Sequence, residues 1–204
     1  MGDSVVTGVG CRHEVGEGPV LPRRVASIIA QQLGVSVRWT CLGETGADVR
    51  MLQANLLPTL REEATRVSGS GQRLDAVVVM TGLNDIKECF LFAQPVACSP
   101  WRFGAMLTSV LGSVREAAGA GCALLVPGHP IEATPRFNQF WPLSAAVHGV
   151  TALWEEQKSL AAEAAQAREV VERGASAPSL VEFLAPPPSM VAQLRGADYF
   201  AADG

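Results

Sequence analysis

Helical and extended hydrophobic patterns alternate along this chain. In residues 22–33, Val25, Ile28, Ile29 and Leu33 recur at the spacing of one helix face, and Gly34 ends the segment. Residues 74–81 instead form a continuous apolar run rich in β-branched side chains, which is typical of a strand buried on both faces of a parallel sheet. Along the whole chain, such patterns predict helices at residues 22–33, 48–67, 100–118 and 145–173. They predict strands at residues 35–41, 74–81, 122–126 and 180–184.

Strands that alternate with helices of this length need crossover connections and therefore form a parallel sheet. No internal repeat or linker divides the 204 residues, so we expect one domain over residues 1–204 with a three-layer α/β/α architecture. Ligands bind such sheets at the carboxyl ends of the strands. We therefore expect the chemistry at the two termini and in the loops at residues 43–46, 82–85 and 128–142.

Composition excludes some partners. The formal net charge is −4 and the isoelectric point is near 5.4, which argues against nucleic acid and anionic membranes as main partners because both need a basic face. The apolar runs at 76–80 and 122–126 are far shorter than the roughly 18 residues of a membrane span, so no transmembrane segment is expected. Five scattered cysteines without a C-x-x-C pair favour reduced thiols and a cytoplasmic location. The sequence leaves the location and the oligomeric state open.

Several familiar site motifs are absent. The chain has no P-loop and no G-x-S-x-G nucleophile elbow, and His13 stands where a dinucleotide-binding pattern begun by Gly8 and Gly10 needs its third glycine. The pair His13-Glu14 lacks the second histidine of a zinc-protease helix. The sequence therefore predicts no nucleotide-binding or zinc-protease site.

Four short motifs are present in a fixed order. Gly2-Asp3-Ser4 opens the chain, the segment 41–46 follows the first predicted strand, Thr81-Gly82-Leu83-Asn84-Asp85 follows the buried strand, and Asp203-Gly204 closes the chain. Each alone is ordinary turn chemistry or a surface carboxylate. Together they resemble the SGNH hydrolase superfamily, also called GDSL esterases and lipases. The G-x-N-D piece after a buried strand is the most specific part of this resemblance, which spans the chain.

The resemblance implies a flavodoxin-like α/β/α fold and a serine esterase or lipase that cleaves carboxylic esters through an acyl-enzyme, without metal or organic cofactor. It makes Ser4 the nucleophile. The backbone N–H groups of Ser4 and Gly46 and the side-chain amide of Asn84 would form the oxyanion hole. The substrate would be a small-molecule or lipid ester, whose identity the sequence does not specify.

The resemblance also assigns supporting roles. Asp3 and Asp85 would hold the loops by hydrogen bonds, and Gly82 would let the strand end turn sharply. Asp203 would orient the histidine base, which the family places two residues after Gly204.

Three departures from the family pattern affect these roles. Cys41 stands where the second motif has an asparagine, so we expect one loop hydrogen bond to be lost. The position of the base histidine lies past Gly204, and only Met1 precedes Gly2 where the family has its central first strand. We therefore expect a domain incomplete at both termini with its first strand largely missing. The alternative to an active esterase is a catalytically inactive remnant of this fold that at most binds ligands.

Other assignments stay open. His129 follows a predicted strand and is therefore a candidate replacement base or a plain loop residue, whereas His13 and His148 are expected in solvent. The loop aromatics line an acyl pocket or serve in packing: Phe137, Phe140 and Trp141. A third hypothesis is an unrelated flavodoxin-like module that binds a small anion at a strand end.

Overall fold

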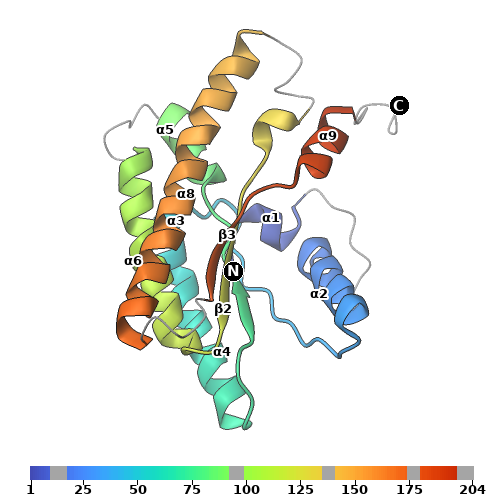
Figure 1. Ribbon diagram of the computed structural model, residues 1–204, viewed down its shortest axis with the longest axis vertical. Coiled ribbons are helices and arrows are strands. Elements are labelled where there is room, and N and C mark those ends of the chain that lie inside the picture. Colours follow the sequence, from blue (N-terminus) through green and yellow to red (C-terminus); the bar gives the residue numbers. More distant parts are fainter. Residues whose placement is uncertain (10–17, 92–98, 135–140, 174–179, 197–204) are drawn as a thin grey trace.

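The computed structural model describes residues 1–9, 18–91, 99–134, 141–173 and 180–196 (Figure 1). Its sheet consists of β1 (Ala76–Val78), β2 (Ala123–Pro127) and β3 (Val181–Leu184) in the order β1-β2-β3. Both pairings are parallel, with Val77 opposite Leu124 in one and Leu125 opposite Glu182 in the other. The predicted parallel α/β sheet is thereby confirmed, although β1 and β3 are shorter than the hydrophobic runs that predicted them.

Helices lie on both sides of this sheet. The described helical segments are α1 (Ser4–Thr7), α2 (Val20–Leu33), α3 (Val49–Met51), the π-helical turn η1 (Leu52–Leu56), α4 (Leu57–Gly69), α5 (Leu83–Leu91), α6 (Pro100–Ala118), the 3₁₀ turn η2 (Ile131–Ala133), α8 (Leu143–Arg173) and α9 (Pro188–Gly196). In Figure 1, α3, α4, α6 and α8 lie on one side of the sheet and α1, α2 and α9 on the other. All four predicted helices are present, whereas α1, α5 and α9 were not predicted.

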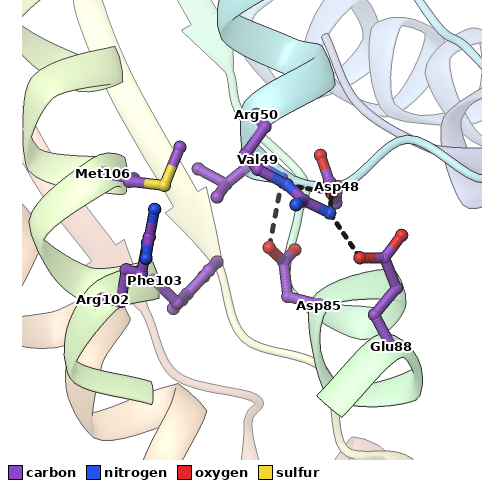
Figure 2. Close-up of a pocket in the computed structure, with 8 residues that line it drawn as sticks. All are labelled: Asp48, Val49, Arg50, Asp85, Glu88, Arg102, Phe103 and Met106. Carbon is purple, nitrogen blue, oxygen red and sulfur yellow. Dashed lines mark hydrogen bonds and ion pairs between the residues drawn. The ribbon is translucent and has the colours of Figure 1, made fainter. Parts of the chain in front are cut away.

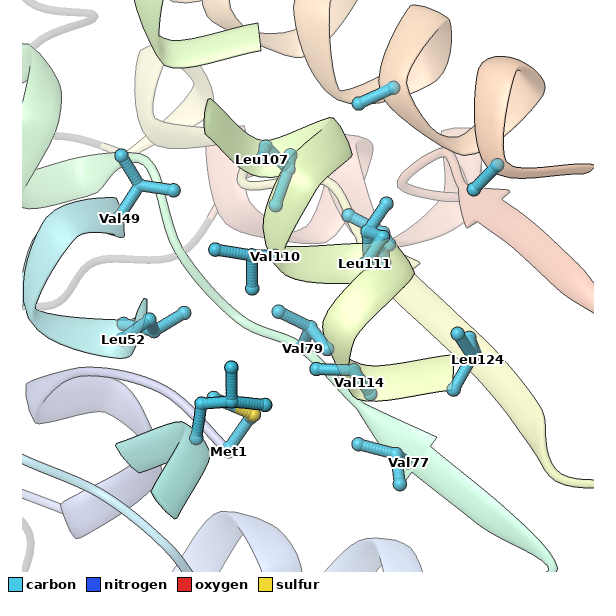
Figure 3. Close-up of a cluster of buried hydrophobic side chains, with 14 of the residues drawn as sticks. Met1, Val49, Leu52, Val77, Val79, Leu107, Val110, Leu111, Val114 and Leu124 are labelled. Atoms are coloured by element: carbon cyan, nitrogen blue, oxygen red, sulfur yellow. The ribbon is translucent and has the colours of Figure 1, made fainter. Parts of the chain in front are cut away.

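The core lies between the sheet and the helices α4, α6 and α8. Leu107, Val110 and Leu111 of α6 are completely buried, as are Val79 and Leu124 of the sheet (Figure 3). Each such side chain contributes about 1.5–3 kcal/mol relative to an exposed one. This side of the sheet therefore supplies most of the apolar packing that fixes the strand ends.

Met1 and Gly2 occupy the position between β1 and residues 42–44. The Gly2 N–H donates to the Leu42 carbonyl (3.0 Å), and the Gly2 carbonyl accepts from the Glu44 N–H (3.0 Å). On the other side, the Met80 N–H donates to the Met1 carbonyl (3.0 Å). A Cβ at Gly2 would lie 2.4 Å from the Met80 carbonyl oxygen, so the close approach of these segments requires glycine. The Gly2-Asp3-Ser4 motif therefore lies between the segment 41–46 and the end of β1, which the motif at residues 81–85 follows.

The predicted strand at residues 35–41 does not form. These residues have no regular secondary structure, and Val35 is half exposed. A strand is stabilised by pairing with a neighbour, and the described hydrogen bonds from Gly2 reach only Leu42 and Glu44. The β-branched pattern was therefore a correct description of side-chain preference but a wrong prediction of structure.

Candidate functional site

In the first motif, Gly2-Asp3-Ser4, the chain leaves its position beside β1 and enters α1 at Ser4. Asp3 is completely buried and caps this helix, because its carboxylate accepts the backbone N–H of Val5 (2.9 Å). Ser4 is the first residue of α1 and is half buried. A backbone N–H in the first turn of a helix has no intrahelical acceptor, so that of Ser4 is available to a bound group.

Asn84 connects this turn to the other two motifs. It lies in the first turn of α5 and is 8% exposed, rather than in a loop as expected. Its amide nitrogen donates to the Ala47 carbonyl (3.0 Å) and, over a longer distance, to Asp3 Oδ2 (3.4 Å). Two acceptors therefore hold the amide. The bond to Asp3 is the longer one, so it is the one that the amide can more easily give up for a bond to a bound ligand.

Asp85 connects the third motif to α3. Its Oδ1 accepts the backbone N–H of Val49 (3.2 Å), and the Thr81 hydroxyl donates to its Oδ2 over 3.5 Å. Burial raises the pKa of Asp85 to about 7, and the nearby carboxylates of Asp48 and Glu88 act in the same direction. Asp85 is therefore about half protonated at neutral pH.

A small pocket borders Asp85 (Figure 2). Its volume of about 10 Å³ holds at most one water molecule, so it does not bind an ester. Within it, Arg50 donates to Asp48 (2.7 Å) and to Glu88, and the dashed line that ends on Glu88 of α5 marks the second of these bonds. The pocket is lined by Asp48, Val49, Arg50, Asp85, Glu88, Arg102, Phe103 and Met106.

Two site glycines have left-handed backbone conformations. Gly46 has φ = 86°, and a Cβ added there would meet no described atom within 4 Å, so conformation rather than crowding favours glycine. Gly82 has φ = 113°, and a Cβ there would lie 2.9 Å from Lys158 Cε. Both the sharp turn and the neighbouring lysine therefore favour glycine at position 82.

Cys41 corrects one expectation about the second motif. Its thiol lies 3.5 Å from the Val6 carbonyl oxygen, to which it donates a weak hydrogen bond. The residue that replaces the family asparagine thus still ties this segment to α1, although a loss of the bond was expected.

Lys158 is the charged residue that the sequence reasoning missed. It projects from α8 and is 1% exposed, with Nζ 2.6 Å from Glu155 Oε1 and 2.7 Å from His129 Nδ1. The available signal was its helical spacing from apolar residues on both sides, because Trp154 and Ala161 are buried on the same face.

His129 lies at the end of β2, as expected, but it is poorly suited to be a base. Burial and the charge of Lys158 lower its pKa to about 3. A general base works best with a pKa near the working pH, and one nitrogen of this ring already faces Lys158. Among the described residues, the other ring nitrogen, Nε2, has no hydrogen-bond partner.

Other predicted residues lie apart or outside the described part of the chain. Trp141 is 82% exposed and His148 is exposed. Asp203, Phe137, Phe140 and His13 fall outside the described residues.

No group of three or more potential metal-ligating side chains occurs within the described ranges. In the same ranges, none of the helices is both long and apolar enough to cross a membrane.

Comparisons with known proteins identify the family and the fold of the chain. The model of the GDSL-like lipase/acylhydrolase family matches residues 1–204, while no curated protein sequence matches the chain. The structure of Axe2, an acetylxylan esterase from Geobacillus stearothermophilus, is similar with a TM-score of 0.52, at 16% identity over 95% of this chain and 88% of that one. An Axe2 mutant described as an acetyl-xylooligosaccharide esterase gives a TM-score of 0.56 at 17% identity, with the same coverage. At these identities the structural likeness establishes a common fold.

Proposed function

Because the chain belongs to the GDSL-like lipase/acylhydrolase family, we propose that it hydrolyses carboxylic esters with Ser4 as the nucleophile. The observation that carries this proposal is the position of Asn84. Its amide donates to Asp3, next to Ser4, and to Ala47, next to Gly46, which supports the proposal that these three motifs form one oxyanion hole. This supports a site for acyl transfer at the strand ends.

The reaction has two halves. Ser4 Oγ attacks the acyl carbon while a base takes the hydroxyl proton, and the carbonyl oxygen becomes an oxyanion. The N–H groups of Ser4 and Gly46 and the Asn84 amide stabilise that charge. Collapse expels the alcohol, which takes the proton, and leaves the acyl group on Ser4. Water then attacks the acyl-enzyme by the same route and releases the acid.

The proposed base is the histidine of the family's D-x-x-H motif. That motif makes Asp203 its orienting partner and places the histidine two residues after Gly204. We favour this base over His129, whose low pKa and contact with Lys158 fit a neutral structural role.

Acetyl esters are the first substrates to test, because the similar structures belong to acetylxylan esterases. In the chain extended by the base histidine, as described below, we expect the Ser4→Ala variant to lose hydrolysis of p-nitrophenyl acetate and labelling by a fluorophosphonate, while its circular dichroism spectrum stays unchanged. Ser36→Ala is the matched control, because Ser36 is exposed and lies outside regular secondary structure. Turnover retained by Ser4→Ala would exclude this nucleophile.

A second experiment tests the base. Two residues are appended after Gly204, the second a histidine, and the control carries alanine at that place. A positioned general base contributes about 10²–10⁴-fold, so the histidine version should hydrolyse the ester faster by about that factor. Equal rates for the two versions would contradict the proposed base. If no version reacts with ester or fluorophosphonate, the alternative of an inactive, ligand-binding remnant holds.

A further inference from the structure

Two ion pairs of α8, both largely buried, lie at opposite ends of the sheet. Glu169 of α8 pairs with Arg115 of α6, and these side chains also bind backbone groups just before β2 and β3. Lys158 pairs with Glu155, three residues earlier on α8, beside the loop that follows β2. Because the site motifs follow the strands, only the Lys158 pair lies at the end of the sheet where the chemistry is expected.

The ammonium of Lys158 connects α8 to the loop after β2. Lys158 Nζ lies 2.6 Å from Glu155 Oε1 and 2.7 Å from His129 Nδ1. Glu155 Oε1 also accepts the backbone N–H of His129 (3.2 Å). A Cβ at Gly128 would lie 2.6 Å from Glu155 Oε2, so the missing side chain there leaves room for the carboxylate. Both α8 side chains are therefore anchored to the β2 loop.

The alkyl stem of the same lysine contacts the turn that follows β1. A Cβ at Gly82 would lie 2.9 Å from Lys158 Cε and 3.4 Å from Nζ, so the end of the lysine side chain lies against this turn. The Gly82 carbonyl accepts the N–H of Ile86 (3.0 Å) and thereby begins α5, whose first turn holds Asn84. The position of Gly82 therefore determines where the Asn84 side chain starts.

We propose that Lys158 is a positioning residue for ester hydrolysis: anchored by its ammonium to the β2 loop, it supports the Gly82 turn and so fixes the Asn84 amide in the oxyanion hole. The inference rests on the proposed function and adds to it a residue from α8 that touches no reacting atom. Charged hydrogen bonds are roughly twice as strong as neutral ones, so they hold the end of the stem more firmly than apolar contacts alone.

Small displacements of Asn84 matter because an oxyanion donor acts over a short range. Such a donor is effective about 2.7–3.1 Å from the position that the oxyanion will occupy, and a misplacement of about 1 Å can cost about 10²-fold in rate. Loss of the support beside Gly82 leaves a space into which the turn can move. Substitution of Lys158 should therefore lower kcat with little change in KM, because the Asn84 bond strengthens only as the oxyanion forms.

The first test compares Lys158→Ala, which removes both stem and ammonium, with Arg115→Met as the matched control. Arg115→Met also removes a cation that pairs with α8, but at the opposite end of the sheet. The side-chain amide of Asn84 is observed by ¹H–¹⁵N NMR in the 204-residue chain and assigned by its loss in Asn84→Ala. We expect its signals to shift in Lys158→Ala and to stay in place in Arg115→Met. Unshifted signals in folded Lys158→Ala would overturn the proposal, and so would an equal shift in both variants.

Kinetics in the chain extended by the base histidine separates positioning from a general loosening of the fold. In Lys158→Ala, kcat for p-nitrophenyl acetate should fall by about tenfold to 10², whereas Arg115→Met should keep it. If Lys158 acts through Asn84, its substitution should cause no further loss of kcat in an Asn84→Ala background. Equal losses in both backgrounds, or a raised KM with unchanged kcat, would contradict the proposal.

A second variant guards against failure to fold. Lys158→Met/Glu155→Gln keeps a stem that reaches about as far as Cε and leaves no unpaired charge at position 155. We expect smaller changes in the Asn84 signals and in kcat than in Lys158→Ala, because the stem remains but its anchor is lost. Unshifted Asn84 signals in this folded variant would overturn the proposal, and unfolding of both variants would do so too, because it would assign Lys158 to the core alone.

Failure of the proposed function is visible separately. In that case a fluorophosphonate does not label Ser4 in the unsubstituted, extended chain. The Asn84 signals still decide whether Lys158 positions the amide.

Discussion

Two buried aspartates flank Asn84, and the fold treats them differently. Asp3 is completely buried and Asp85 is 7% exposed, so both lose hydration and both have raised pKa values. On the side of Asp3, the ammonium of Lys158 opposes this effect. On the side of Asp85, the neighbouring charges of Asp48 and Glu88 add to it and bring the pKa to about 7.

The difference shows that burial alone does not set the charge of a carboxyl group. Asp48 and Glu88, whose charges raise the pKa of Asp85, lie beside it and both bind Arg50 (Figure 2). Lys158 instead lies on the other side of the site, against Gly82. The two carboxyl groups therefore differ in the charges beside them, and we expect Asp85 to be partly protonated at neutral pH.

The largest loss of activity is expected on substitution of Asn84, which lies between Asp3 and Asp85. Asn84→Ala removes the amide between Asp3 and Ala47 and with it one donor to the oxyanion. In the chain extended by the base histidine, kcat for p-nitrophenyl acetate should fall by about 10²–10³. The change in KM should be smaller, because the hydrogen bond from the Asn84 amide strengthens as the negative charge develops on the oxyanion. A raised KM with unchanged kcat would instead make Asn84 a substrate-binding residue.

A smaller effect is expected from Asp3→Asn. The variant keeps an oxygen that can cap α1 but loses the charge, and a charged hydrogen bond is worth about 1 kcal/mol more than a neutral one. We expect kcat to fall by about tenfold to 10², and by less in the matched variant Asp85→Asn, because Asp85 contacts Val49 and Thr81 rather than the Asn84 amide. Steady-state kinetics of the two variants at one pH tests this. A larger loss in Asp85→Asn would reverse the comparison.

Stability should depend on pH through Asp85. Its folded pKa of about 7 exceeds the unfolded value of about 3.9, so the folded state binds more protons between these pH values. The free energy of unfolding should therefore fall as pH rises through this window, by on the order of 2 kcal/mol between pH 5 and pH 7 from this group.

Urea unfolding at several pH values measures this contribution. The Asp85→Asn variant should show a flatter dependence, and the difference between the two chains isolates Asp85 from Asp3, whose pKa is also raised. Parallel curves for the two chains would show that Asp85 titrates at its ordinary pKa.

The helices show how far hydrophobic pattern predicts tertiary structure. The helix predicted at residues 100–118 is found with the same bounds, and its apolar face is buried in the core. The helix predicted at residues 22–33 is also present, as α2, yet its predicted apolar residues Ile28 and Leu33 are 57% and 69% exposed. Both segments have apolar residues at the helical period. Whether the apolar face is buried depends on a second element that packs against it, and the pattern of one segment gives no information about that element.

The candidate site divides in the same way. Gly46, Asn84 and Asp85 could be selected from the sequence because their motifs follow predicted strands, and Ser4 because its motif precedes them in a recognisable order. The extension of α5 back to Asn84 and the hydrogen bonds of that side chain could not, since they depend on where separate loops meet. Asp203 and its role remain a prediction from the motif.

The sequence by itself determined the parallel α/β architecture, the positions of its long helices and the strand-end motifs, because these follow from local periodicity and turn chemistry. Tertiary structure decided that residues 35–41 form no strand, since a ladder needs a neighbour. It also decided the charges of the site. Lys158 is far from Gly82 and His129 along the chain, and only the tertiary packing of α8 brings its side chain against both of them.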